Sequence, residues 1–469
     1  MVEHDLVEGL RPSPACGGTP SPLRPGAPAV LLIAAWVTAF LTGCAGHEVR
    51  VEAALDALDR GAPAEAVAAL NEEMEVASTR DLPADLEGDN ALLLLERATV
   101  LQSMDRYGES ARDFGAADKA IEVLELSANA ADDVGRYLFS DDVGRYRAPP
   151  FEKLLINTLN AMNYLARRDL SGARVEARRL AVIQRYFGDQ GERTALLGLG
   201  SYLAGFAFEK SGRHAEALNH YDEALQYAAY RTLRDPLRVL TKGEPKTRAI
   251  DRLVAGAGPL PSIAETGQAE LCIVVGYGRV PRKEPVRIPI GLALTLVSGH
   301  LSPHDHARAN ELAAKGLVTW VNFPRLGKSR GRHAIPTLAI DGRPVGLEHA
   351  LDIEQEVRKA WEENEGTVIL AAITRLLARA AAGEITQAAT GAAADSGVVG
   401  LLAGLATTAT LAAADTPDTR SWTTLPANVA IARVRVRPGR HHLRISARGI
   451  TKDYRVDVRP RDWAFIAMT

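Results

Sequence analysis

The chain has 469 residues, of which 46% are hydrophobic and 24% are charged, and its formal net charge is −3. This length suits two or three globular domains of ordinary size. Because positive and negative charges are nearly balanced, the composition excludes a dedicated nucleic-acid-binding protein, and we expect no nucleic acid among the partners.

The N-terminal region has the pattern of a secretory signal. Residues 27–40 form an apolar run that is shorter than the roughly 20 residues of a membrane-spanning helix. The run ends in LTGC, residues 41–44, which resembles the lipobox of bacterial lipoproteins, where the signal peptide is cleaved before a cysteine that carries lipid. We therefore predict a signal peptide over residues 1–43 and fatty acylation of Cys44, palmitate included. The alternatives are an ordinary secretory signal and an uncleaved anchor.

The residue after the expected lipidation site is Ala45 and not Asp. In bacteria with two membranes, this resemblance implies sorting to the outer membrane, with the protein anchored by its lipid and facing the periplasm. Cys16 is then removed with the signal, so Cys272 has no partner for an internal disulfide. Its position within LCIVV predicts a buried, small hydrophobic side chain.

Four stretches after Cys44 show helical periodicity: residues 51–74, 92–120, 154–183 and 197–227. In the last of them, small residues let two antiparallel helices approach, aromatic rings fill the gaps and a glycine permits the turn. We predict an N-terminal α-solenoid of tetratricopeptide-like helical hairpins over residues 44–250, and a generic helical bundle is the alternative. The residues expected to pack within the repeats are Ala98, Phe114, Ala117, Ala161, Tyr164, Ala173, Gly205, Phe208, Gly212, Ala217, Tyr221 and Ala224.

The periodicity changes after a Pro- and Gly-rich break at residues 256–261. A first β segment is expected over residues 265–351 and a second over residues 415–469. We interpret the two segments as one β-sandwich-like domain interrupted by helices, so the predicted fold class is α+β. The strands expected in them are residues 270–276, 318–323, 337–340, 429–436, 442–446, 454–458 and 463–468, with a hairpin turn at Asp341-Gly342.

The two β segments are separated by a helical insertion, residues 352–414, that is rich in Ala and Gly. Asp352 is placed to cap the start of its first helix. The second part contains Gly400-x-x-x-Gly404, a pattern that permits close contact between membrane helices. The insertion is either a hairpin that contacts the bilayer or a helix packed within a soluble domain, and we favour the second interpretation because the uncharged run is barely of membrane length. The expected apolar stripe on the first helix is Val368, Ala372, Leu376 and Ala380, with Arg375 and Arg379 away from it.

Motifs that could carry chemistry are few. Gly327-Lys328-Ser329 matches the end of a phosphate-binding loop, but the earlier glycine and a following helix are missing. The arginines from Arg433 to Arg461 alternate along the expected strands, which predicts a solvated face. We expect no catalytic, cofactor-binding or metal-binding residues and no enzymatic activity. Side chains that we assign to polar loops are His300, His304 and His306, and the pair Asp141-Asp142.

Two stretches extend the family resemblance beyond the lipobox. They are residues 146–179, beginning YRAPPFEKLL, and residues 418–441, beginning DTRSWTTLPA. Together with the degenerate repeats they resemble a family of uncharacterised bacterial lipoproteins that contain tetratricopeptide repeats. The resemblance implies a place in the cell envelope and no catalytic residues, and genes of the family can lie beside genes for regulators of peptidoglycan synthesis. Within the second stretch we expect Trp422 to wedge between helices and sheet, and Arg420 to pair with Asp415 or Asp418.

Two functional hypotheses follow. In the first, the chain is a lipid-anchored cell-envelope scaffold, active in envelope or peptidoglycan maintenance, whose helical-repeat groove binds a protein partner. In the second, it is a membrane-active structural protein that forms oligomers through the Gly- and Ala-rich helical insertion. A hydrolase is the least favoured interpretation, because neither a nucleophile elbow nor a convincing carboxylate pair is present.

Overall fold

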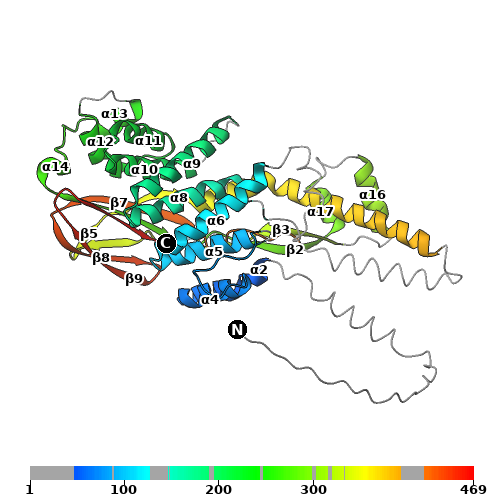
Figure 1. The fold of residues 1–469 in the computed structure, drawn as a ribbon. Helices are drawn as coiled ribbons and strands as arrows, with labels where there is room; N and C mark the ends of the chain where they lie inside the picture. The colour runs from blue at the N-terminus through cyan, green and yellow to red at the C-terminus, as the bar shows by residue number, and fades with distance from the viewer. Residues whose placement is uncertain are drawn as a thin grey trace, which may run out of the picture. The chain divides into compact units, whose positions relative to one another are not determined.

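The computed structural model describes residues 47–86, 89–126, 146, 148–189, 195–242, 247–297, 303–314, 320–331, 333–391 and 417–469. Every described residue belongs to one compact unit, Ala45–Thr469. This unit combines helices with β-sheets, which confirms the α+β class (Figure 1). Predictions that concern Cys44, the signal peptide, Asp141-Asp142, His300 and Gly400-x-x-x-Gly404 lie outside the described residues.

Helices of the first half form antiparallel pairs, each joined by a short turn. Small residues in these helices allow close packing, and the apolar side chains of successive pairs form one continuous core. The elements are α2 (His47–Arg50), then the pairs α3 (Glu52–Asp59) with α4 (Pro63–Glu73), α5 (Asn90–Ser103) with α6 (Tyr107–Leu126), α8 (Pro150–Ala166) with α9 (Leu170–Asp189) and α10 (Leu196–Lys210) with α11 (His214–Tyr227), followed by η1 (Arg231–Leu233), α12 (Arg234–Leu240), α13 (Arg248–Val254) and α14 (Ile263–Thr266).

The four helix pairs share one turn geometry. The second residue after the first helix has a positive φ of 61° to 76° in each turn, and it is Gly61, Asp105, Arg168 or Gly212. In every turn the next backbone N–H donates to the carbonyl five residues earlier, at 2.8 to 3.0 Å. This is the hydrogen bond of a Schellman helix end, which favours glycine at the left-handed position. Two of the four turns therefore hold a side chain in a conformation that costs it about 1–2 kcal/mol.

Those two side chains contact the sheets. Asp105 accepts a hydrogen bond from the hydroxyl of Tyr454, at 3.2 Å. Arg168 forms an ion pair with Asp462, and its guanidinium lies 5.1 Å from the ring centroid of Trp463. The two middle turns thus fasten the last strands to the helices, which offsets the strain of their non-glycine residues.

All the residues expected to pack within the repeats lie in these helices or turns. Most are fully buried, Tyr164 is half-buried, and Gly212 forms the turn between α10 and α11. The closest approach is between Gly205 on α10 and Tyr221 on α11, because a Cβ atom at position 205 would lie 2.5 Å from the Tyr221 ring. Phe208 stacks on His220, with ring centroids 5.1 Å apart.

The strands form three sheets. The first has the order β10-β1-β7-β6, the second is the ribbon β2-β3, and the third has the order β5-β4-β8-β9. Strands pair in antiparallel fashion except β1 and β10, which are parallel. The strands are β1 (Ala269–Tyr277), β2 (Lys283–Pro289), β3 (Trp320–Leu326), β4 (Thr337–Ile340), β5 (Arg343–Val345), β6 (Glu348–Asp352), β7 (Asn428–Val436), β8 (Gly439–Ala447), β9 (Ile450–Val458) and β10 (Trp463–Met468).

Strand β1 lies between two cores because its side chains alternate in direction. Leu271, Ile273 and Val275 belong to the apolar core shared by the two four-stranded sheets. Cys272 and Val274 belong to the core of the helices. All nine residues of the strand are therefore buried, and the sheet β10-β1-β7-β6 forms a middle layer between the helices and the sheet β5-β4-β8-β9.

The helical insertion packs mainly on the ribbon β2-β3, and the first turns of α17 also contact β7. Helices α15 (Ile290–Leu296), α16 (Pro303–Ala314) and α17 (Ile353–Gly391) share a third apolar core with the ribbon (Figure 1). The expected apolar stripe is partly corrected: Ile369, Ala372, Ile373 and Leu377 are buried on α17, and Arg375 is buried with them instead of facing solvent. Val368 is half-buried, Leu376 packs at the edge of this core, and the side chains of Arg379 and Ala380 lie outside the description.

The polar loop that we expected around His304 and His306 is wrong, because both residues lie on α16. Side chains that are two residues apart on a helix lie on different sides of it, so the two imidazole rings do not face each other. The rejection of Gly327-Lys328-Ser329 as a phosphate loop is consistent with the structure, since the segment follows β3 and is not followed by a helix.

Replacing Gly205 with Ala should destabilise the protein by about 1–3 kcal/mol, because the added methyl group would overlap the Tyr221 ring. Gly115→Ala is the matched control: Gly115 is also within a helix, but the space beside it is open, so this change should stabilise by about 0.5–1 kcal/mol. Denaturant midpoints of the two variants check this. Equal midpoints would contradict the close approach of α10 and α11.

Candidate functional site

A partner groove on the repeats would lie along the side of α5, α8 and α10 opposite their paired helices. In the structure, the chain's own strands cover this side. Helices α5 and α8 contact β10, and α10 contacts β6. The Phe206 ring on α10 lies 5.6 Å from that of Trp463 and 5.9 Å from that of Phe465, both on β10. These aromatic contacts exclude water and leave no open groove on this face of the described helices.

An irregular segment before β7, residues 420–426, crosses the same helical face, with a turn at Thr423 and Thr424. The carboxylate of Glu96 on α5 accepts the backbone N–H groups of Thr423 and Thr424, at 2.6 and 2.8 Å. The Trp422 ring is 1% exposed, donates from Nε1 to the Thr99 hydroxyl at 3.0 Å and packs edge-on against Phe114. The prediction that Trp422 wedges between helices and sheet is therefore confirmed. The segment thus covers the surface of the helices on which a peptide ligand of a repeat protein would bind.

Arg420 anchors the start of this segment. Its Nε donates to Asp418 Oδ1 at 2.8 Å, which confirms one of the two expected pairings, and its Nη1 lies 3.3 Å from Asp89 Oδ1. Burial would raise the pKa of Asp418, but the hydrogen bonds and charge of Arg420 outweigh it and lower that pKa.

A buried cluster of charges joins the helices to the first sheet. Arg433 on β7 donates to both carboxylate oxygens of Glu209 on α10, at 2.7 Å, and from Nε to Glu270 on β1 at 2.8 Å. Lys210 also contacts Glu270, and the Tyr221 hydroxyl donates to Glu209 at 2.7 Å. The Arg433 side chain is 1% exposed, so the prediction of a solvated arginine face is wrong for this residue.

The charges of the cluster stabilise one another. Burial opposes ionisation of Arg433, but Glu209 and Glu270 outweigh this effect and raise its pKa. Burial alone would raise the pKa of Glu209, and Arg433 and Lys210 instead lower it. Because each charge here has a partner within hydrogen-bond distance, removing one would leave the other uncompensated, at a cost of about 3–5 kcal/mol. The cluster therefore fixes the sheet on the helices and offers no free group for chemistry.

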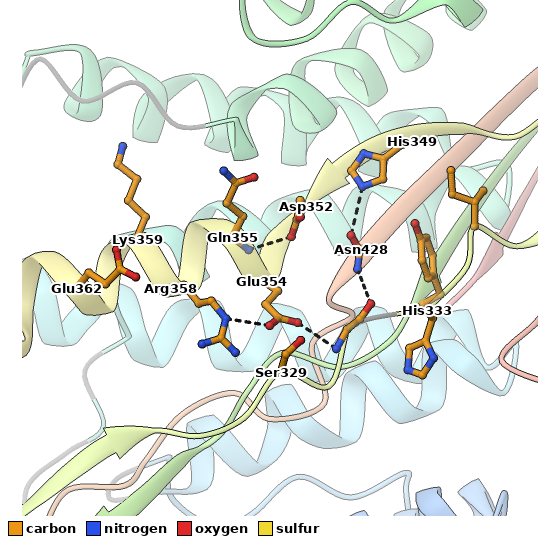
Figure 2. Close-up of a pocket in the computed structure, with 13 residues that line it drawn as sticks. Ser329, His333, His349, Asp352, Glu354, Gln355, Arg358, Lys359, Glu362 and Asn428 are labelled. Atoms are coloured by element: carbon orange, nitrogen blue, oxygen red, sulfur yellow. Dashed lines mark hydrogen bonds and ion pairs between the residues drawn. The ribbon is translucent and has the colours of Figure 1, made fainter.

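An open cavity of about 700 Å³ lies where the first turns of α17 meet β6, β7 and the loop after β3. Figure 2 shows Glu354 and Arg358 on α17 turned toward this loop, and His349 on β6 above Asn428 on β7. Lys359 extends from α17 away from the loop. The lining therefore presents cations, carboxylates and imidazoles together, with the exposed Ile335 as an apolar contact.

The floor of this pocket is held by Gly331. Its N–H donates to Glu354 Oε2 at 3.0 Å, and its carbonyl accepts from Asn428 Nδ2 at 3.1 Å. Arg358 Nε donates to the other oxygen of Glu354 at 2.9 Å. A side chain at position 331 would collide with Ala427 and Glu354, so only glycine fits. As predicted, Asp352 caps α17, because it accepts the N–H of Gln355 at 2.9 Å.

The pocket can recognise a polar ligand, but its described residues show no catalytic arrangement. Glu354 and Asn428 are engaged in holding the loop, and His349 Nε2 lies 3.2 Å from Asn428 Oδ1. No group of three His, Cys, Asp or Glu side chains suited to a metal ion occurs in the part of the chain that the structure describes. Cationic donors and anionic acceptors lie together along the open wall of the pocket. This arrangement suits a segment of polypeptide or another polar chain.

Sequence reasoning missed this pocket. Asn428 and Gly331 are 97 residues apart, and no motif links them. The only local signal was the capping residue Asp352, which placed the start of α17 but not its neighbours.

Comparisons with protein-family models, with curated proteins and with solved structures gave no match for this chain. Among the described helices, none is both long and apolar enough to cross a membrane.

Between pH 5 and 8, the free energy of unfolding should fall because of Glu152 on α8. Burial raises its pKa to about 7 from an ordinary value of 4.5, while the Tyr146 hydroxyl donates to it at 2.5 Å. The folded state then holds a proton that the unfolded chain releases, so stability present below pH 4.5 is lost as the pH rises through 7, by roughly 3 kcal/mol.

Glu152→Gln should remove this part of the pH dependence, and the exposed control Glu52→Gln should not. Denaturant unfolding at several pH values measures the effect. Parallel pH profiles for the parent chain and Glu152→Gln would refute the assignment.

Proposed function

We propose that this chain is a lipid-anchored scaffold of the bacterial cell envelope, held at the outer membrane through Cys44 and facing the periplasm, that binds a protein partner. The lipobox-like sequence supports the anchor. The open pocket at α17, lined by charged and polar side chains, supports binding of a partner. The resemblance to repeat-containing lipoproteins supports a role in envelope or peptidoglycan maintenance.

We further propose that the helix pairs are degenerate tetratricopeptide repeats and that the two four-stranded sheets form a β-sandwich-like domain. The identical left-handed turn in four successive pairs and the contact between Gly205 and Tyr221 support the first. The apolar core shared by the two sheets supports the second.

The partner, in this proposal, docks at the α17 pocket and not in the groove. The observation that carries this is the covered helical face: residues 420–426 and β10 occupy the surface of α5, α8 and α10 that a repeat protein would offer to a peptide. Displacing them would break the hydrogen bonds of Glu96 to Thr423 and Thr424 and the ring contacts of Phe206 with β10. The pocket needs no such displacement, because its cavity is already open.

A second candidate is a membrane-active structural protein built on the helical insertion. It is favoured by large apolar side chains that are exposed on the ribbon β2-β3 and the helices packed on it. These are Leu292 and Leu296 on α15 and Trp320 on β3. Arg287 lies over the Trp320 ring at 5.4 Å, an arrangement suited to a lipid interface.

Substituting Cys44 with Ala should move the protein from the membrane fraction to the soluble fraction, because the acyl chains supply the anchor. Cys272→Ala is the matched control and should stay in membranes, since that thiol is fully buried. Fractionation without detergent, with mass spectrometry of the N-terminal peptide, measures both. Retention of Cys44→Ala in membranes would favour the membrane-active candidate instead.

A photo-crosslinking residue at Glu362, in the pocket, should capture a discrete partner in intact envelopes. The control position is Thr367, which is exposed on the same helix about 140° around its axis. Lys359→Glu should reduce the crosslink at position 362 about tenfold, because it reverses a lining charge. Equal crosslinking at the two positions would argue against the pocket as the docking site.

A further inference from the structure

The first described residues of the chain are rigidly built into the body. The side chain of His47 is 0% exposed, with Nε2 at 3.6 Å from Glu96 Oε1. Arg50 donates from Nε to Glu73 Oε2 at 3.0 Å and from Nη2 to the Glu73 carbonyl at 2.8 Å. Val51 is buried in the helical core. The first described residues are therefore packed into the body of the protein.

The same face holds the loop that precedes Trp422. Glu48 accepts a hydrogen bond from Thr419. Asp89 binds both segments, with Oδ2 at 3.3 Å from Arg50 Nη1 and Oδ1 at 3.3 Å from Arg420 Nη1. Residues 47–50 and 417–421 thus pack together in a region that we call the N-terminal face. His47, Thr419 and Arg420 are buried in it, and Val49 and the neighbouring Glu52 are exposed.

Chain length limits how far this face can lie from the lipidation site. Cys44 precedes His47 by three residues, and consecutive Cα atoms are 3.8 Å apart, so the two Cα atoms are separated by at most about 11 Å. An acylated cysteine lies at the level of the lipid headgroups, because its chains enter the hydrocarbon layer. A body that starts at His47 cannot move away from that layer.

We infer that the N-terminal face rests directly on the lipid headgroups of the membrane that holds the acyl chains, so that the scaffold is docked in one orientation and not suspended on a tether. This inference rests on the proposed lipidation of Cys44. The arginines of this face are paired with Glu73, Asp89 and Asp418, so the acyl chains and not a basic patch hold the face on the membrane. The contact should therefore form on uncharged phospholipid vesicles.

The test uses lipidated full-length protein in phosphatidylcholine vesicles with an acceptor dye on the headgroups. A donor dye is placed at Glu52→Cys beside the N-terminal face, or at Arg252→Cys on α13, the last helix packed on α11. Cys272 does not interfere, because it is fully buried and burial raises the pKa of its thiol to about 12. Mass spectrometry verifies the lipid on Cys44 in each sample.

Energy transfer from position 52 should exceed that from position 252 roughly threefold. Inserting 20 Gly and Ser residues between Gly46 and His47 should abolish the difference, since such a linker spans about 25 Å. Equal transfer from both positions of the uninterrupted, lipidated chain would overturn the inference and leave the lipid anchor intact. A difference that survives the linker would also overturn it, and an unmodified Cys44 would overturn the proposed function as well.

Discussion

Arg433 is the constraint on which the arrangement of this protein depends. Its guanidinium lies on the middle sheet, out of reach of solvent, and binds carboxylates from α10 and β1 at once. A buried cation is stable only where such partners are already in place, so the sheet must dock on the helices in one register. The Phe206 ring centroid lies 4.9 Å from the Arg433 guanidinium carbon, and the ring also packs on the aromatic side chains of β10. We call this buried contact between helices and sheet the seam.

This seam buries the face of the helix pairs that could otherwise bind a partner. An array of helical hairpins commonly presents an inner face to partners, but here α5, α8 and α10 bury that face against the chain's own strands and the Trp422 segment. Two of the four turns even use strained side chains, Asp105 and Arg168, to hold the last strands. Helices and sheets therefore form one supporting body, and the proposed docking site lies instead at the open pocket beside α17.

Much of the local structure could be predicted from the sequence, because periodicity reports which positions are buried. The helix pairs, the hairpin at Asp341-Gly342 and most strands of the two β segments followed from it, but β2 and β6 were not predicted. Periodicity does not say which surface covers a buried face. Arg433 has the spacing of a solvated residue, and its burial depends on Glu209, 224 residues away. The parallel pairing of β10 with β1, and the pocket between Gly331 and Asn428, likewise depend on distant partners and left no local signal.

The central claim is that helices and sheets unfold as one body because the buried seam joins them. Native-state hydrogen exchange at increasing denaturant tests it most directly. Backbone amides in α10 and in β7 should converge on the same opening free energy and exchange together. Exchange of β7 and β8 amides at low denaturant, while α5, α8 and α10 stay protected, would show that the helices stand without the sheet and would contradict the account.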